Sequence, residues 1–532
     1  MMKKCTLIIV YLILAQTIIA QQGGSFSGSF QSNTNFFMRD SAVGAINTPQ
    51  YDNQLSGSEA WLNLDYTGYG FDIGMRLDLF YNSNLRNPQQ SFSAQGIGNW
   101  YIHKKIDKLD IWGGYIYDQI GTGIIFRAFE ARPLGIDNSL LGARLIYDLN
   151  PSTQIKFFTG KQRNYFELYE PVITGLNLET AWSPNDSSDF QLIPGFGAIN
   201  RTLDDQSMAL VVSNIESQPV ADRFVPKYNV YAFTAYNTLI YKDFTWYVEG
   251  AYKTREAIFD AREGRIVNRD GSVLYSSLSY AVKGLGISLD VKRTENFDSR
   301  VSPNEVANNG LITFLPPMAR QNTFRLTARY NAATQFLGEM AYQIDVTYAP
   351  TRKQFYNLNY SNITDLNGNL LYREIFTEAT FKGKRRKWQW TSGLQLQSYN
   401  QEIFEEKPGV PLVETIIPYT EFTYRLTRKK SVKAELQYMV TDEDFGQWFF
   451  ALLEYNISPH WSFAVSDMIN TMKTSSSQEA THYPTVFVAY NYKSNRFALS
   501  FVQQVEGVVC TGGICRLEPA FSGVRLNVTS QF

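Results

Sequence analysis

The stretch FDIGMRLDL, residues 71–79, decides the fold class of this chain. Apolar side chains occupy every second position of this stretch, and Asp72, Gly74, Arg76 and Asp78 lie between them. Successive side chains of a β-strand point to opposite faces, so this pattern predicts a strand with one apolar and one charged face. The same alternation recurs in many segments, among them 285–292, 324–330, 388–397 and 432–440.

The connections between these segments show how the strands are arranged. Tight turns lie at Thr67-Gly68, Lys242-Asp243, Lys283-Gly284, Ser458-Pro459 and 493–495, and they alternate with long polar stretches at 40–56, 83–95, 255–272, 295–320, 350–370, 399–412 and 469–482. Short periplasmic turns and long extracellular loops are typical of outer-membrane barrels, whereas a soluble β-sandwich has no reason to alternate them. We therefore predict an all-β, transmembrane, antiparallel up-and-down barrel of about 24 strands, with a range of roughly 20 to 26. The segment 198–226 stays open, because its apolar run 208–212 fits either a strand or a folded extracellular loop.

Composition supports one membrane domain. The chain has 532 residues, of which 19% are charged and 15% aromatic, with a net charge of −1. The charged fraction is below that of soluble domains, and the charge balance gives no sign of a nucleic-acid partner. No composition shift divides the chain, so we predict a single barrel domain over residues 21–532.

The first twenty residues predict a cleaved signal peptide, residues 1–20. Lys3 and Lys4 precede an apolar run at 7–19, and Ala20 is a small residue before the expected cleavage. The alternative is a membrane anchor, but the run is shorter than the span of about 20 residues that a helix needs. Cys5 precedes the apolar run, so no lipid anchor is predicted.

The polar face of the predicted strands should line the barrel lumen. This set contains Arg76, Asp78, Glu249, Lys253, Asp290, Lys292, Arg325, Arg329, Lys433 and Glu435. A barrel of this width holds water unless something fills it. Because the set mixes both signs of charge, we expect weak charge selectivity.

The segment 119–138 carries the most distinctive cluster of charges. Arg127, Glu130, Arg132 and Asp137 lie close together in a connection that would fold into the lumen or over its mouth. The functional interpretation is a constriction that selects solutes by charge and size. The alternative is a structural loop held by salt bridges. The run 121–123 lacks the third glycine and the helix of a nucleotide-binding loop.

Cys510 and Cys515 flank Thr-Gly-Gly-Ile in the last connection. On the extracellular side they predict a disulfide, and a metal site or a pair of free thiols is the alternative. A metal site would need further ligands, and none is nearby in sequence. The three histidines are far apart in the chain, so no Ser-His-acid site is expected. We predict no enzyme, no cofactor and no metal.

The chain resembles the large outer-membrane barrels of the Bacteroidota. The segments that carry the resemblance are 117–127, 132–138, 510–516 and 519–523, with the expected cleavage before Gln21. The last strand ends on Phe532, which is similar to the C-terminal signal that barrel-assembly machinery reads in Gram-negative bacteria. The resemblance implies an outer-membrane location and brings no particular activity. It does not extend to TonB-dependent receptors, because strand-like alternation begins soon after Gln21 and leaves no room for a plug domain.

Two functions remain open at this point. The first is porin-like passive or semi-selective diffusion of small hydrophilic solutes. The second is a loop-plugged barrel that acts as a scaffold or binding partner in a secretion or surface-protein complex. The aromatic loops would then dock a partner through Phe297, Phe314 and Leu315 of 295–320, and Phe355, Tyr356 and Tyr360 of 350–370. Alternatively, these side chains only pack the loops together.

Overall fold

The strands close into one antiparallel barrel. The computed structural model describes residues 24–185, 188–260, 263–472, 480–511 and 513–532, so the predicted signal peptide lies outside the described residues. The sheet has 24 strands, and its first strand, β1 (Gly24–Phe37), pairs with both β2 (Ser56–Gly68) and the last strand, β30 (Phe521–Gln531). A closed sheet leaves no edge, which lets strands cross a membrane with every backbone group bonded. The predicted fold class and strand number are confirmed.

The remaining barrel strands follow each other around the wall in chain order. They are β3 (Phe71–Ser83), β4 (Phe92–Ile106), β5 (Leu109–Ile116), β10 (Leu140–Asn150), β11 (Thr153–Asn164), β12 (Glu167–Thr180), β13 (Phe190–Thr202), β14 (Asn229–Tyr241), β15 (Phe244–Asp260), β16 (Arg265–Val282), β17 (Leu285–Glu295), β18 (Gly338–Thr351), β19 (Gln354–Thr364), β20 (Leu370–Lys382), β21 (Trp388–Tyr399), β22 (Val413–Arg425), β23 (Lys430–Met439), β24 (Trp448–Ile457), β25 (Trp461–Asn470), β26 (Thr481–Tyr492) and β27 (Asn495–Gln504). Short hairpins inside the connections pair β6 (Asp118–Gln119) with β7 (Arg127–Ala128), β8 (Glu130–Ala131) with β9 (Ile136–Asp137), and β28 (Gly507–Thr511) with β29 (Ile514–Glu518).

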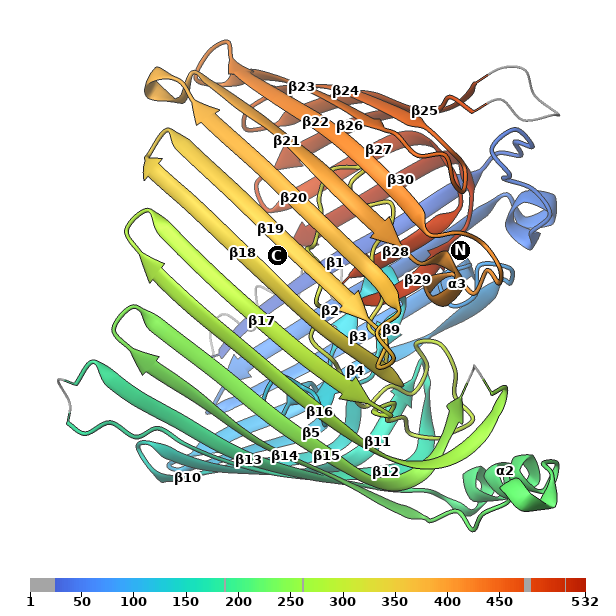
Figure 1. The fold of residues 1–532 in the computed structure, drawn as a ribbon, viewed down its shortest axis with the longest axis vertical. Coiled ribbons are helices and arrows are strands. Elements are labelled where there is room, and N and C mark those ends of the chain that lie inside the picture. The colour runs from blue at the N-terminus through green and yellow to red at the C-terminus, as the bar shows by residue number, and fades with distance from the viewer. Residues whose placement is uncertain (1–23, 186–187, 261–262, 473–479, 512) are drawn as a thin grey trace.

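Tight turns and long loops lie at opposite ends of the barrel. The turns include 69–70 and 283–284, where Gly70 and Gly284 adopt positive φ values that favour glycine. The opposite end carries long loops such as 38–55 and 296–337. Figure 1 shows the tilted strands, with α2 (Asp205–Glu216) and α3 (Gln401–Phe404) at the loop end. The predicted arrangement of short periplasmic turns and long extracellular loops is therefore confirmed in outline, and the loop end also has short connections such as 165–166.

The open segment 198–226 contains a helix rather than another strand. β13 ends at Thr202, and the Asp204 side chain accepts hydrogen bonds from the first turn of α2. Val211 and Ile215 of α2 are buried against strand residues of β15 and β16. The apolar run 208–212 therefore belongs to a folded extracellular loop. Among the described residues, no helix is long and apolar enough to cross a membrane.

Two predicted loops are wrong. The stretch 255–272 is mostly strand, because β15 extends to Asp260 and β16 begins at Arg265. The stretch 350–370 holds a tight turn at 352–353 and then β19, so Phe355, Tyr356 and Tyr360 lie on a barrel strand. Asn357, Asn359 and Ser361 face inward on the same strand and are buried. Their polarity made a lumen-facing strand look like a loop.

The outer surface of the barrel is apolar and the inner surface is polar. On β3, Met75, Leu77 and Leu79 are 38%, 39% and 39% exposed, whereas Arg76 and Asp78 between them are 4% and 3% exposed. A soluble protein has the reverse pattern, with charges outside and apolar side chains inside. The exposed apolar faces therefore contact lipid. Trp388 and Trp390, exposed beside the turn 383–387, are placed as expected for the aromatic girdle at the inner interface.

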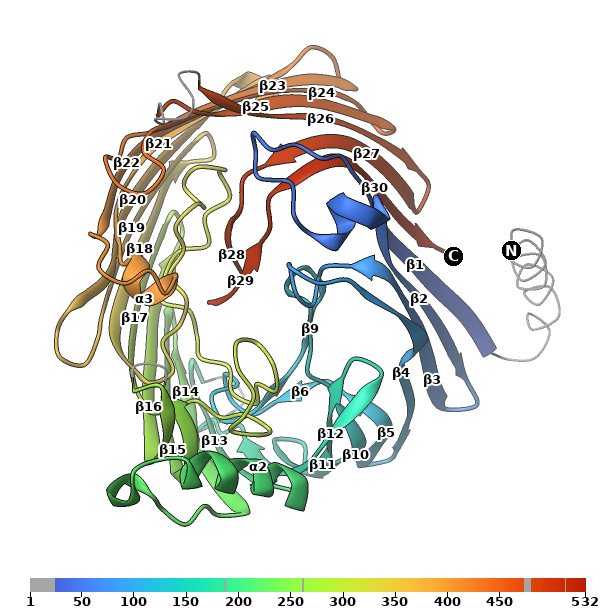
Figure 2. The same cartoon turned by 90° about the vertical axis from the view of Figure 1, so that its right-hand side faces the viewer.

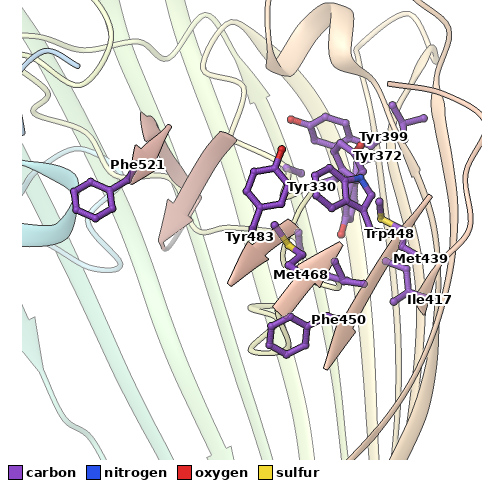
Figure 3. Close-up of a cluster of buried hydrophobic side chains, with 14 of the residues drawn as sticks. Tyr330, Tyr372, Tyr399, Ile417, Met439, Trp448, Phe450, Met468, Tyr483 and Phe521 are labelled. Carbon is purple, nitrogen blue, oxygen red and sulfur yellow. The ribbon is translucent and has the colours of Figure 1, made fainter. Parts of the chain in front are cut away.

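The segment 324–330 is not a strand, although it alternates like one. It belongs to the loop 296–337, which turns back into the barrel interior, where Figure 2 also shows β28 and β29 inside the ring of strands. Leu326 and Tyr330 are buried in a cluster with the inward-facing Tyr372, Trp448 and other wall residues (Figure 3). This burial against the wall explains the alternation. The lumen is therefore partly filled by loops of the chain itself.

Candidate functional site in the barrel lumen

The predicted constriction forms an ion-pair network with the barrel wall. Arg76 pairs through its guanidinium with Asp78 at 2.7 Å, with Glu130 at 2.8 Å and with Asp137 at 2.9 Å. Arg163, on β11, pairs with both Asp78 and Asp137. Three of the four predicted residues are thus in one network, because Arg132 also pairs with Glu130 at 2.9 Å.

Burial and space explain how this network is held. Burial would favour a neutral Asp137, but Arg163 and Arg76 outweigh that effect and lower the pKa of Asp137. On the neighbouring strand β4, a Cβ atom at Gly98 would overlap the Asp78 carboxylate, so glycine leaves the room that this side chain needs. The network encloses a cavity of about 70 Å³, which is small for a solute. Its geometry fits the alternative of a salt-bridged structural loop, and the role of a selective constriction stays a prediction.

Arg127 is the predicted residue that the network leaves out. Its guanidinium lies 4.0 Å from the ring centroid of Phe314 and 5.0 Å from that of Phe129. Burial lowers its pKa. Arg127 therefore stacks between aromatic rings of two loops, which fastens the loop 117–139 to the loop 296–337.

The strands β14 to β18 form a packed wall, defined by Thr234, Glu249, Lys253, Lys292 and Glu339. All of these side chains face inward and are essentially inaccessible to solvent. Lys292 pairs with Glu339 at 2.7 Å, and Lys253 pairs with Glu256 at 2.6 Å. Loops supply the other contacts: Lys253 donates to the carbonyl of Asp298 at 2.6 Å, and Glu249 accepts from the backbone of Thr122 at 3.0 Å. This side of the lumen is sealed by protein.

The remaining predicted lumen residues divide into two groups. Asp290 accepts a hydrogen bond from Tyr275 at 3.0 Å, and Lys433 lies 3.9 Å from Glu435 and 3.5 Å from Glu421, all on inward faces of strands. Arg325 and Arg329 also face the lumen, but from the loop 296–337 and not from a strand, which corrects their predicted place. Sequence reasoning missed Arg163, Glu256 and Glu339, the partners that buried charges required.

The strands β30 and β1 form a second kind of wall, here called the seam wall, where the two ends of the sheet meet. Its inward pairs are Ser29 with Gln531, Gln31 with Thr529, Asn33 with Asn527, and Asn35 with Arg525. Asn527 donates to Asn33 at 2.9 Å. Asn527, Thr529 and Gln531 are exposed and the β1 residues are mostly half-buried, so this wall stays open to the lumen.

One cavity of about 280 Å³ lies beside this wall, and a second of the same volume lies against the hairpin β28–β29. One is lined by Gln31, Asn33, Asn35, Arg525 and Asn527 together with the hairpin residue Glu518. The other is lined by part of the loop 296–337, by residues 504–508, and again by Glu518. The hairpin β28–β29 thus separates two spaces that share one carboxylate.

The same hairpin contains the predicted disulfide. Cys510 is opposite Cys515 in the strand register, which is the backbone arrangement that a short cross-strand disulfide needs. The side chain of Cys510 lies outside the described side chains, and the disulfide stays a prediction. In the described parts of the chain, no group of three or more His, Cys, Asp and Glu side chains is placed to hold a metal ion.

A closed barrel with an apolar, aromatic-edged outer surface and a polar interior is an outer-membrane β-barrel. Residues 1–532 match the model described as a family of unknown function, DUF6029, and the chain belongs to this family. The search of curated proteins found no match.

The solved structures that match this chain have very different sequences. The translocation pore of the P pilus usher PapC has a TM-score of 0.46 and 9% identity, over 95% of this chain and 99% of that chain. The ferric-catecholate import receptor Fiu of E. coli K12 has a TM-score of 0.37 and 10% identity, over 96% and 81%. OpdK of Pseudomonas aeruginosa with vanillate has a TM-score of 0.36 and 9% identity, over 96% and 98%. Similarity at this level carries no inference about what this chain transports or binds.

Proposed function

We propose that the protein is a channel through which small hydrophilic solutes diffuse across the outer membrane along the seam wall. The observation that carries this proposal is the contrast in accessibility inside one lumen. Asn527, Thr529 and Gln531 are exposed, whereas Lys253 and Lys292 of the packed wall are fully buried. Amide and hydroxyl groups bond to water and to hydrophilic solutes without holding either tightly, which suits passage.

The folded loops make such a channel narrow and semi-selective. A barrel of this strand number would enclose a wide aqueous lumen if it were empty. Here the loop 296–337 buries Phe297 and Leu315 inside the barrel, and the hairpin β28–β29 lies between the two cavities. Cavities of about 280 Å³ are near the lower limit of small-molecule sites. We therefore propose small solutes as the cargo.

The alternative is a loop-plugged barrel that serves as a scaffold in a secretion or surface-protein complex. The filled side of the lumen favours this scaffold function, because the loop 296–337 covers the packed wall completely. Phe297 and Leu315 are buried, so they pack the loop and do not offer a docking surface, in contrast to the sequence-based hypothesis. Neither function assigns the chain a catalytic role, a cofactor or a metal. Both require outer-membrane lipid around the barrel and the assembly machinery that inserts it.

Single-channel recording separates the two functions. The purified, refolded mature protein is added to a planar bilayer, with heat-denatured protein as the control. Stable ohmic steps, smaller than those of an unobstructed barrel of this width, support diffusion along the seam wall. Complete silence from protein that migrates as a folded barrel in unheated gel samples would overturn the channel and favour the scaffold, whose partners would then be sought by crosslinking.

A further inference from the structure

The junction of the two lumen cavities gathers arginine side chains from three separate parts of the chain. Arg325 comes from the loop 296–337 and lines one cavity. Arg516 comes from the hairpin and Arg525 from the seam wall, and both line the other cavity. Glu518 is the carboxylate common to both cavities. This arrangement places Arg516 and Arg525 beside the proposed route along the seam wall and Arg325 in the adjoining cavity.

Arg325 is a lumen cation that makes no ion pair with any described residue. In the part of the chain that the structure describes, no carboxylate lies within ion-pair distance of its guanidinium. The side chain of Arg325 is exposed to the cavity. Partial desolvation by the surrounding protein lowers the pKa of Arg325, Glu518 opposes this shift, and Arg329 and Arg525 add to it. An arginine keeps its charge in any protein environment. Its positive charge therefore faces the cavity, where a dissolved anion can reach it.

The other two arginines are only weakly engaged. Arg525 lies 3.8 Å from Glu518, which is longer than a hydrogen bond, and its guanidinium is 4.0 Å from the ring centroid of Phe521. Arg516 donates to the carbonyl of Leu85 at 3.1 Å. Among the described residues, neither makes the two-pronged carboxylate contact that a guanidinium prefers.

The other charges that line these cavities have contacts of their own or lie at the margin. Arg132 is held by Glu130, and Arg329 lies 3.9 Å from Asp444. Glu59 accepts a hydrogen bond from Ser83 at 2.5 Å, and it also acts electrostatically on Arg516 and Arg525. Glu506 lines the same cavity as Arg325 but is exposed, and it does not contribute to the electrostatic shift at Arg325. Arg325, Arg516 and Arg525 therefore face two carboxylates at this junction, Glu518 and Glu59, which leaves an excess of positive charge.

We propose that this junction is a binding site for a small oxyanion, a carboxylate or a phosphate, held between Arg325 and Arg525 in place of Glu518. The planar fork of a guanidinium matches the paired oxygens of both anions. Phe521 beside Arg525 and Phe324 beside Arg325 give the site an apolar border, which suits an organic anion. The inference rests on the proposed channel for access, and it names the solute class that the channel favours.

The first test is ion selectivity. The reversal potential is measured in a KCl gradient for the wild type, for Arg325→Gln, for the double variant Arg325→Gln/Arg525→Gln, and for Arg255→Gln as the control. Arg255 lies towards the extracellular end of β15, and its side chain is 68% exposed. It pairs with Asp270 and lines neither of the two cavities. We expect a preference for chloride that falls by about threefold or more in the double variant and is unchanged in the control. Glu518→Gln should act in the opposite direction and raise the preference.

The second test measures binding without conduction. Detergent-solubilised protein is heated with sodium acetate, inorganic phosphate or NaCl at one ionic strength. We expect acetate or phosphate to raise the melting temperature above its value in NaCl, and we expect Arg325→Gln to abolish the rise. The anion that produces the larger rise separates a carboxylate site from a phosphate site.

The two tests fail independently. A silent bilayer together with an oxyanion-dependent rise in melting temperature would overturn the channel and keep the site. Ohmic conductance with equal selectivity in the wild type and the double variant, and no rise in melting temperature, would overturn the site and keep the channel. Gel mobility of unheated samples confirms that each variant is folded before either measurement.

Discussion

The packed wall and the seam wall are made from strands of the same pattern, yet their inward side chains meet opposite environments. On the packed wall, Lys292 is fully buried and pairs with Glu339 at 2.7 Å. On the seam wall, Asn527 is exposed and bonds to Asn33 across the closing strands. Strand alternation determines only which side chains point inward. The loops that fold into the lumen determine whether those side chains meet protein or water.

This difference accounts for the chemistry of each wall. A charge that is covered by protein must have a partner, because removing it from water is costly. The packed wall accordingly contains matched pairs, such as Lys253 with Glu256 and Lys292 with Glu339. Amides that face water need no such partner, so no loop has to cover them, and the solute route along the seam wall stays open. Substitutions should therefore affect stability on one wall and conduction on the other.

Removing the loop that creates the packed wall should have the largest effect. Replacing residues 297–336 with a short glycine-serine linker opens the filled half of the lumen, so single-channel conductance should rise several-fold, as expected for an unfilled barrel of more than about 16 strands. The matched control replaces 205–216, the helix α2, whose buried residues pack on β15 and β16. That control should conduct like the wild type. Equal conductance in both deletions would show that the loop does not narrow the channel.

Breaking a buried pair on the packed wall should have the next largest effect. Lys292→Met leaves the Glu339 carboxylate buried without its partner, so the free energy of unfolding should fall by about 3–5 kcal/mol. Urea unfolding from lipid vesicles measures the change. The double variant Lys292→Met/Glu339→Leu should recover most of the loss, because it removes both charges. A double variant as unstable as the single one would mean that packing, and not the unpaired charge, is responsible.

The ion-pair network around Asp137 should give a smaller, pH-dependent effect. Arg163 and Arg76 lower the pKa of Asp137 in the folded protein, so this carboxylate stabilises the fold fully above its unfolded pKa of about 3.9 and loses that contribution as the pH falls through the folded value. Asp137→Asn should be destabilised by roughly 2–3 kcal/mol at neutral pH and should lose less stability than the wild type on acidification below about pH 4. Asp52→Asn, which breaks an exposed pair with Arg39 at 3.7 Å, is the control and should match the wild type.

The sequence predicts the barrel well because its signal is local. Alternation in 71–79 and 285–292 identifies strands and correctly assigns Arg76, Asp78 and Lys292 to the inside. The C-terminal strand shows the same signal, which places Arg525 and Asn527 on the lumen side.

The sequence does not predict what fills the lumen, because that depends on contacts between distant segments. The segment 324–330 alternates because Leu326 and Tyr330 pack on the barrel wall while Arg325 faces a cavity, and a pattern with a period of two cannot distinguish this from a strand. The partners Arg163 and Glu339 lie on other strands, so only the closed barrel brings them to Asp137 and Lys292.

A new charge on the seam wall should have the smallest effect on stability. It allows a direct comparison with a new charge on the packed wall. In Asn33→Asp the carboxylate faces lumen water and still accepts the hydrogen bond from Asn527, so the free energy of unfolding should change by less than about 0.5 kcal/mol. The added negative charge beside the route should nevertheless shift the reversal potential modestly towards cations. On the packed wall, Thr234→Asp introduces a charge at a position that is 1% exposed and next to Glu249, and it should be strongly destabilised. Similar destabilisation by both substitutions would mean that the seam wall is covered in the membrane, and the proposed route would then be closed.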